Sequence, residues 1–209
     1  MFHVKEIYYT LQGEGSRTGR PSVFCRFSGC NLWTGIEADR EKSICSFCDT
    51  DFLGTDGPGG GKHKDIKSLI NKIDSEWPKS QPNKYVVFTG GEPALQITKA
   101  LVYELQIKGF EVAIETNGTL ELPDNIDWVT VSPKADTKIS VTSGNELKLV
   151  FPQTENNPDN FIHMDFEEFY LQPKDDDERN INTQKTIQYC LENPEWKLSL
   201  QTHKYMGIP

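Results

Sequence analysis

The feature that most constrains the fold is a series of short apolar runs, each of which stops at a polar turn. The runs that read as strands lie at residues 22–28, 85–89, 111–115, 128–131, 146–150, 169–172 and 197–200. Three stretches with helical spacing of apolar residues lie between some of them, at 65–77, 94–108 and 183–193. Strands that alternate with helices predict an α/β protein with a mostly parallel sheet.

The number of helices limits which α/β fold is possible. About three helices for six or seven strands are too few for a closed eight-fold barrel. The chain has 209 residues, a length typical of one domain. We therefore expect one domain over residues 1–209, built as a partial, open parallel β/α barrel with about six strands. Residues 34–43, 54–61 and 174–179 have the composition of loops.

Polar residues follow the ends of five predicted strands. These strand ends begin at Thr89, Glu115, Ser132, Gln172 and Gln201. Parallel barrels build their ligand site where the strands end. One such segment alone could be only a turn, but five in register predict a single crevice at that end of the sheet.

Charge and hydropathy argue against nucleic acids and membranes as binding partners of this chain. The formal net charge is −9, which weighs against a surface that binds nucleic acid, because such a surface is basic. No run approaches the roughly 18 apolar residues of a membrane span, and the first ten residues lack a signal-peptide core. We expect a cytoplasmic protein that acts on a small molecule and has no membrane partner.

The five cysteines suggest metal or redox chemistry rather than disulfides. Cys45 and Cys48 form a C-x-x-C pair, and Cys30 precedes them by fourteen intervening residues. Cys25 alternates with apolar neighbours on a strand, and Cys190 stands alone on a helix, so both are expected in the core. Three ligands without a convincing fourth favour an open coordination site, and the cysteines alone leave zinc and an iron–sulfur cluster equally open.

Two neighbouring motifs favour the cluster. Phe47 directly precedes the last cysteine, and the sequence Gly90-Gly91-Glu92-Pro93 follows a strand. This combination resembles the radical S-adenosylmethionine (SAM) superfamily. The resemblance implies a 4Fe–4S cluster on Cys30, Cys45 and Cys48, with SAM on the remaining iron. The spacing C-x14-C-x2-C departs from the usual C-x3-C-x2-C and suggests an insertion within residues 31–44.

A closer resemblance covers nearly the whole chain. The motifs that carry it, in order, are Leu11–Gly15, Phe24–Phe27, Cys48–Thr50, Gly90–Pro93, Glu115–Gly118, Ser132–Lys134, Leu200–Lys204 and Gly207–Pro209. Together they resemble the 7-carboxy-7-deazaguanine synthase family. The resemblance implies a homodimeric lyase of queuosine biosynthesis that converts 6-carboxy-5,6,7,8-tetrahydropterin to 7-carboxy-7-deazaguanine and ammonia. It also implies a 5′-deoxyadenosyl-radical ring contraction with a 4Fe–4S cluster, S-adenosyl-L-methionine, Mg²⁺ and an electron donor such as flavodoxin.

The same resemblance implies roles for individual residues. The cluster ligands Cys30, Cys45 and Cys48 are the catalytic residues, and Thr50 is the Mg²⁺ ligand, with Asp51 as a chemical competitor. Cofactor contacts fall on Phe47, Cys48, Asp49, Gly91, Ser132, Pro133, Lys134, Gln172, Pro173, Lys174 and Asp175. Substrate contacts fall on Leu11, Gln12, Gly13, Arg26, Thr89 and Pro209, with Arg26 on the substrate carboxylate and the terminal carboxylate of Pro209 on the pterin ring.

Two other functions stay open at this point. One is another small radical SAM enzyme, such as an activating enzyme that places a glycyl radical on a partner protein. The other is a zinc-stabilised binding module. Gln12, Arg26 and the ending Gly207–Pro209 argue against the first, and iron and sulfide analysis would exclude the second.

Overall fold

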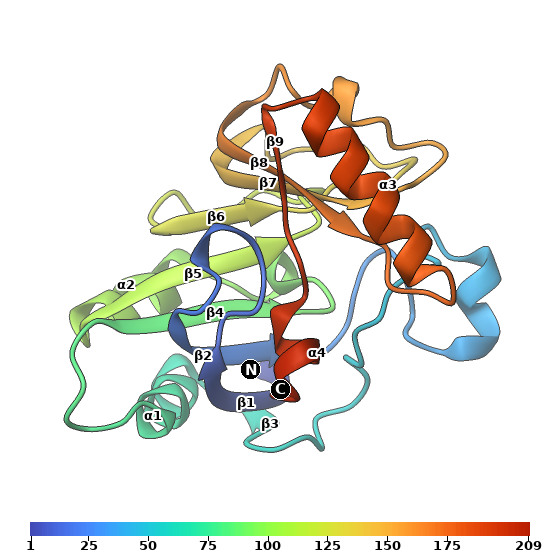
Figure 1. The fold of residues 1–209 in the computed structure, drawn as a ribbon. Helices are drawn as coiled ribbons and strands as arrows, with labels where there is room; N and C mark the ends of the chain where they lie inside the picture. The colour runs from blue at the N-terminus through green and yellow to red at the C-terminus, as the bar shows by residue number, and fades with distance from the viewer.

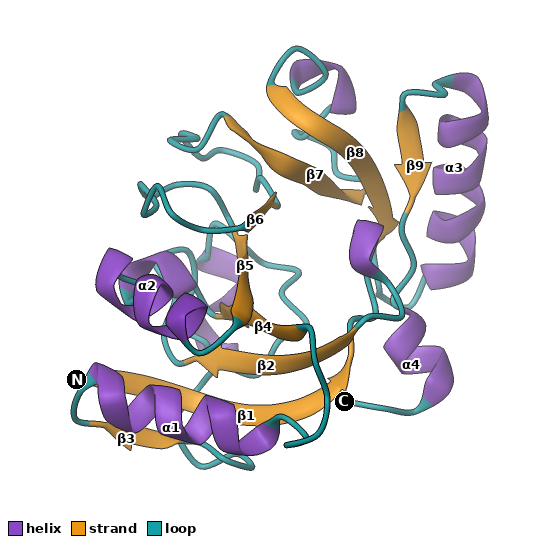
Figure 2. Cartoon of the chain, turned by 90° about the vertical axis from the view of Figure 1, so that its left-hand side faces the viewer, coloured by secondary structure: helices purple, strands orange, loops and turns teal.

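The computed structural model describes residues 1–209, and all nine of its strands form one sheet that curves into an open arc (Figures 1 and 2). The strand order is β3-β1-β2-β4-β5-β6-β7-β8-β9. The strands are β1 (Phe2–Leu11), β2 (Pro21–Phe27), β3 (Gly61–His63), β4 (Lys84–Gly90), β5 (Phe110–Thr116), β6 (Trp128–Val131), β7 (Ser143–Phe151), β8 (Asp165–Pro173) and β9 (Trp196–Leu198). From β2 to β9 all neighbours run parallel. The predicted partial barrel is confirmed.

Two strands were not expected from the sequence. β1 pairs antiparallel with β2 and β3, so these strands extend the sheet beyond its parallel part. The β1–β2 register shifts between Val4 and Glu6, and this irregularity breaks the alternation of buried and exposed residues along β1. A period of two is the signal by which a strand is recognised, so β1 escaped prediction. β3 is only three residues long and adjoins the glycine-rich stretch predicted as a loop.

The helices are α1 (Ile66–Glu76), α2 (Lys99–Ile107), α3 (Arg179–Glu192) and α4 (Thr202–Met206). α1 begins where predicted, because Asp65 and Ser68 form a capping box. α2 begins later than predicted, since Thr98 caps it and Pro93–Leu95 form a separate 3₁₀ turn. α3 begins four residues before the predicted helix. The remaining 3₁₀ turns are Gly15–Arg17, Glu37–Lys42 and Pro158–Asn160.

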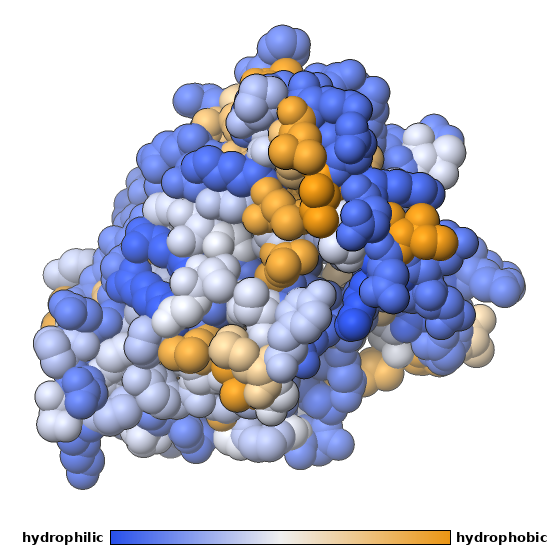
Figure 3. Space-filling model, in the orientation of Figure 1, coloured by the Kyte–Doolittle hydropathy of each residue, from blue (hydrophilic) through white to orange (hydrophobic).

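Apolar packing lies on the outer, convex side of the arc. One buried cluster joins α1 and α2 to β1, β2, β4 and β5, and a smaller one joins β6 to β9. Figure 2 shows α1, α2 and α3 outside the arc and α4 at its open side. No helix has the length and apolar character needed to span a membrane. The face seen in Figure 1 is mostly hydrophilic, apart from an apolar strip along β9 (Figure 3). The inner side of the arc is therefore where polar side chains can gather.

The loop between β1 and β2, residues 12–20, crosses the inner side of the sheet (Figure 1). Arg17 and Arg20 form ion pairs with Glu111 at 3.2 and 2.5 Å, and they stack on Trp128 and Tyr85. Glu111, Trp128 and Tyr85 lie at the beginnings of their strands. We call this loop the hairpin loop. It fills the inner side of the arc where the parallel strands begin and leaves the inner side open where they end.

Candidate active site

A cavity of about 380 Å³ opens where the parallel strands end. It brings together every predicted site residue except Pro133. These are Leu11, Gln12, Gly13, Arg26, Cys30, Cys45, Phe47, Cys48, Asp49, Thr50, Thr89, Gly91, Ser132, Lys134, Gln172, Pro173, Lys174, Asp175 and Pro209. Pro133 lies outside the cavity wall, and its carbonyl oxygen accepts a hydrogen bond from Asn156. The single crevice predicted at the strand ends is thus present.

Three cysteines face this cavity, and the other two do not. Cys30, Cys45 and Cys48 lie in its wall, whereas Cys25 is fully buried in the apolar core. Cys190 packs beside the smaller apolar cluster and is not part of the cavity wall. No group of three or more His, Cys, Asp or Glu side chains is arranged to hold a single metal ion. The cavity therefore offers three sulfur ligands and no fourth cysteine.

Electrostatics distinguishes the three thiols. A hydrogen bond with Cys45 lowers the pKa of Cys48 to about 6, and the same contact, together with burial, raises the pKa of Cys45. Burial raises the pKa of Cys30. The Lys134 ammonium donates to the backbone oxygen and the hydroxyl of Ser132, at 2.7 Å each. Although burial lowers its pKa, this ammonium is close enough to Cys45 and Cys48 to favour their thiolates.

The two glycines of the Gly-Gly-Glu-Pro motif hold Cys30 in place. A Cβ on Gly91 would lie 2.0 Å from the carbonyl oxygen of Gly29, so no other residue fits there. The close approach allows the Gly91 N–H to donate to Phe27 and the Glu92 N–H to donate to Gly29. The end of β4 is thereby bonded to the segment that carries Cys30.

Glu92 of the same motif is fully buried and does not line the cavity. Its carboxylate accepts from the Thr116 hydroxyl at 2.6 Å and from the Asn117 and Ala94 N–H groups at 2.8 and 2.9 Å. Burial nonetheless raises its pKa. These bonds join the end of β4 to the end of β5, so in this structure Glu92 fixes the shape of the cavity floor.

Thr50 and Asp51 differ in how free their oxygens are. Asp51 forms an ion pair with Lys5 at 3.0 Å and accepts from the Leu53 N–H, so it caps the turn that follows. The Thr50 hydroxyl has no hydrogen-bond partner in the protein, and Thr50 lines the cavity. The competition between these two oxygen donors therefore favours Thr50.

Arg26 already has partners inside the protein. Its Nε donates to Glu6 at 2.7 Å and its Nη2 donates to the Tyr8 hydroxyl at 3.0 Å. All three residues line the cavity. A guanidinium has five N–H donors in a fixed plane, so donors remain for a ligand. As the alternation along β2 predicted, Arg26 faces the cavity while Cys25 faces the core.

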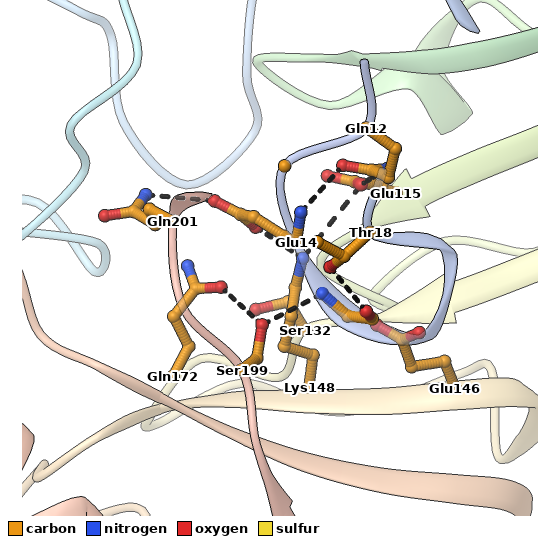
Figure 4. A network of polar contacts seen from close by, with 12 residues as sticks. Gln12, Glu14, Thr18, Glu115, Ser132, Glu146, Lys148, Gln172, Ser199 and Gln201 are labelled. Carbon is orange, nitrogen blue, oxygen red and sulfur yellow. Dashed lines mark hydrogen bonds and ion pairs between the residues drawn. The ribbon is translucent and has the colours of Figure 1, made fainter. Parts of the chain in front are cut away.

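A polar network connects the hairpin loop to the sheet (Figure 4). Lys148 lies between Glu14 at 2.5 Å and Glu115 at 4.0 Å, and Gln12 donates to Glu115 at 2.9 Å. Glu146, two residues before Lys148 on β7, accepts from the Ser16 N–H at 2.9 Å. The network thus gathers three glutamates around one lysine.

Glu146 leads to a prediction about pH. Burial raises its pKa to about 7, so the folded protein keeps a proton there that the unfolded chain releases near pH 4.5. Folding stability from this group is complete below pH 4.5 and is lost as pH rises through 7. Glu146→Gln keeps an oxygen for Ser16 and removes the titration. We expect the free energy of unfolding of the wild type, relative to Glu146→Gln, to fall by roughly 2–3 kcal/mol between pH 5 and pH 8.5 in denaturant titrations. A constant difference would mean that Glu146 ionises normally.

The C-terminal segment closes one side of the cavity. Gln201 donates to Glu14 and to Asp49, both at 3.0 Å, and Lys204 contacts Asp49 at 2.7 Å and Asp175 at 2.5 Å. An oxygen of the terminal carboxylate of Pro209 accepts from the Thr10 hydroxyl at 3.2 Å. Residues that are distant in the sequence therefore meet around Asp49, beside the C-x-x-C pair.

Several residues of the cavity wall were given no role from the sequence. Glu115, Gln201, His203 and Lys204 stood in segments predicted to form the crevice, whereas Glu6, Tyr8, Glu14 and Lys148 were not placed there. One signal was available for Lys148. Glu146 and Lys148 alternate with Leu147 and Leu149, and charged residues on one face of a strand with an apolar opposite face point to a polar barrel interior. Glu14 stood inside a quoted motif, but only the three residues before it were assigned.

We compared the sequence and the structure of this chain with those of known proteins. No protein-family model matches the chain. The 7-carboxy-7-deazaguanine synthase of Bordetella pertussis is 56% identical over 208 residues, which cover 100% of this chain and 99% of that protein. The protein of the same name from Caulobacter vibrioides is 53% identical with the same coverage. Among solved structures, QueE from Escherichia coli superimposes with a TM-score of 0.69 at 27% identity, covering 97% of this chain and 94% of that one.

Proposed function

The chain belongs to the 7-carboxy-7-deazaguanine synthase family, and on that premise we propose how its residues carry out the reaction. It is a radical SAM lyase that converts 6-carboxy-5,6,7,8-tetrahydropterin to 7-carboxy-7-deazaguanine and ammonia. The observation that supports this most is the cavity itself. Residues assigned to the cluster, SAM, Mg²⁺ and the substrate, which lie far apart in the sequence, line one space.

The donor set suits a 4Fe–4S cluster. Cys30, Cys45 and Cys48 supply three thiolates, and a cluster presents one iron to each of them. A structural zinc ion would need four ligands, and Cys25 is in the core. A cluster held there, together with SAM, would supply the radical chemistry for hydrogen abstraction from the substrate. We assign SAM binding to Phe47, Asp49, Gly91, Ser132, Lys134 and residues 172–175, all of which line the cavity.

The chain's own residues bind and orient the substrate. Arg26 offers free guanidinium donors to the substrate carboxylate. In the same cavity wall, Glu14 and Glu115 offer carboxylate oxygens to the amino and ring N–H groups of the pterin. Gln12 and Gln201 hold those two carboxylates, and the C-terminal segment restricts entry of water. A ring held at both ends keeps one position for hydrogen transfer.

Product analysis tests this function. Iron-loaded, anaerobically purified protein incubated with 6-carboxytetrahydropterin, SAM, Mg²⁺ and a reductant should form 7-carboxy-7-deazaguanine and ammonia. Absence of both products from protein with a full cluster would contradict the assignment. A colourless protein that holds zinc and no sulfide would instead favour the binding module.

Thr50 supports a prediction about Mg²⁺. Its hydroxyl is unpaired in the cavity wall, whereas Asp51 is bonded to Lys5 and Leu53. Mg²⁺ binds hard oxygen ligands and keeps several positions for substrate and water. Thr50→Val should remove most of the Mg²⁺ stimulation of turnover, while Asp51→Asn should keep it. Iron content should be unchanged in both variants. Equal stimulation in wild type and Thr50→Val would exclude Thr50 as the ligand.

Assembly and location complete the proposal. We expect a homodimer in the cytoplasm that receives electrons from a small donor protein such as flavodoxin, as the family likeness implies. Light scattering at micromolar concentration measures the oligomeric state, and a monomer under those conditions would contradict it. Product formation with reduced flavodoxin in place of a chemical reductant tests the donor.

A further inference from the structure

Lys148 is the only cation in this network, and its side chain is almost completely covered although it forms part of the cavity wall. Its side chain is 6% exposed, and its ammonium lies 2.5 Å from Glu14 Oε2 and 4.0 Å from Glu115 Oε1. Removing an ammonium from water costs several kcal/mol unless close negative charges compensate for it. The two glutamates provide that compensation, and they hold the pKa of Lys148 above its ordinary value against the effect of burial.

The two glutamates are more open to the cavity than the lysine. Their side chains are 15% and 23% exposed, and both line the cavity. They come from different elements, since Glu14 lies on the hairpin loop and Glu115 on β5. Gln201 donates to Glu14 and Gln12 donates to Glu115, but Lys148 is the residue that reaches both carboxylates. The ammonium of Lys148 thus contacts two carboxylates that are more exposed to the cavity than the ammonium itself.

We propose that Lys148 is a positioning residue for substrate recognition: its buried ammonium keeps the carboxylates of Glu14 and Glu115 together and directed at the N–H donors of the substrate ring. This inference rests on the proposed function, because the ligand is the aminopyrimidine ring of the carboxypterin. Without the cation, two partly buried negative charges would repel each other across the site. The two carboxylates would then move apart and present their oxygens to the ring less well.

A purely structural role makes a different prediction. A lysine that only joined the hairpin loop to β7 would affect stability, and a stable variant would still bind substrate normally. Glu146 on the same face of β7 already holds the loop through the Ser16 N–H. Gly15 fits closely against Glu146, because a Cβ there would lie 2.1 Å from its Oε1. The loop therefore has an anchor that does not involve Lys148.

Calorimetric binding of 6-carboxytetrahydropterin to cluster-loaded protein with SAM and Mg²⁺, but without reductant, tests the proposal. Lys148→Met should weaken this binding about 10- to 100-fold, the loss of one or two charge-assisted bonds. Binding of SAM, measured separately, should change less than threefold. Lys148→Arg should recover much of the affinity, because it restores the cation. The matched control is Lys99→Met. It removes the exposed ion pair between Lys99 on α2 and Asp124, and this variant should bind as the wild type does.

A double variant separates recognition from folding. Lys148→Met with Glu14→Gln removes the uncompensated buried charge and should be more stable than Lys148→Met alone. Its substrate affinity should remain low, because an acceptor has lost its charge. Wild-type affinity in either stable variant would overturn the positioning role. If the wild type itself fails to bind the carboxypterin, the proposed substrate is wrong, whatever the variants do.

Discussion

Replacement of any one of Cys30, Cys45 and Cys48 by alanine is expected to abolish both the iron–sulfur cluster and turnover. All three thiols face the cavity, and none of the remaining cysteines can replace a missing ligand, because one is in the core and the other on α3. With only two thiolates left, the protein cannot hold three corners of a cluster. Iron and sulfide content after anaerobic reconstitution, with visible absorption, measures the first loss, and product formation measures the second.

The two remaining cysteines provide the matched controls. Cys190→Ala should keep its iron and its activity, since Cys190 packs beside an apolar cluster. Cys25→Ala should also keep the cluster, although removing a fully buried side chain should lower stability by roughly 1 kcal/mol. Loss of iron from Cys25→Ala at normal folding would mean that the ligand assignment is wrong. Retention of a full cluster by a variant of Cys30, Cys45 or Cys48 would contradict it equally.

The sequence predicted the parallel sheet and part of the cavity wall, but it did not predict every strand. Short apolar strands and the polar residues after them predicted the parallel sheet and its crevice, because local periodicity reports which face of a strand is buried. Motif order then assigned about half of the residues of the cavity wall. The antiparallel strand β1 was missed, since its register shift destroys the periodicity on which prediction depends.

The buried network was missed for another physical reason. Glu14, Glu115 and Lys148 belong to three elements that are distant in the sequence. In the sequence each looks like an ordinary charged residue. Only the folded structure shows that the ammonium of Lys148 compensates the two carboxylates. Glu92 belongs to the Gly-Gly-Glu-Pro motif, in which only Gly91 was assigned a cofactor contact, and its carboxylate joins β4 to β5. Long-range charge compensation is not encoded in local periodicity.

Arg26 gives the second large expected effect. Arg26→Met should lower kcat/KM for 6-carboxytetrahydropterin about 10- to 100-fold, which corresponds to roughly 1.5–3 kcal/mol for a charge-assisted hydrogen bond. Arg26→Lys should recover only part of this, because a lysine lacks the planar pair of donors that fits a carboxylate. Glu6→Gln weakens the internal ion pair at 2.7 Å and should leave substrate affinity equal or better.

A ligand without the carboxylate isolates the contact. Arg26 also holds β1 to the cavity through Glu6 and Tyr8, so its loss could disturb the site indirectly. Tetrahydropterin lacks the group that Arg26 is proposed to bind, and an indirect disturbance would weaken both ligands by the same factor. A direct contact instead predicts that the wild type prefers the carboxylated ligand and that Arg26→Met loses that preference, with Mg²⁺ held constant. Calorimetric binding of both ligands to both proteins completes the double-mutant cycle. A preference that survives in Arg26→Met would assign the carboxylate to Mg²⁺ or another residue and leave Arg26 as a support for β1.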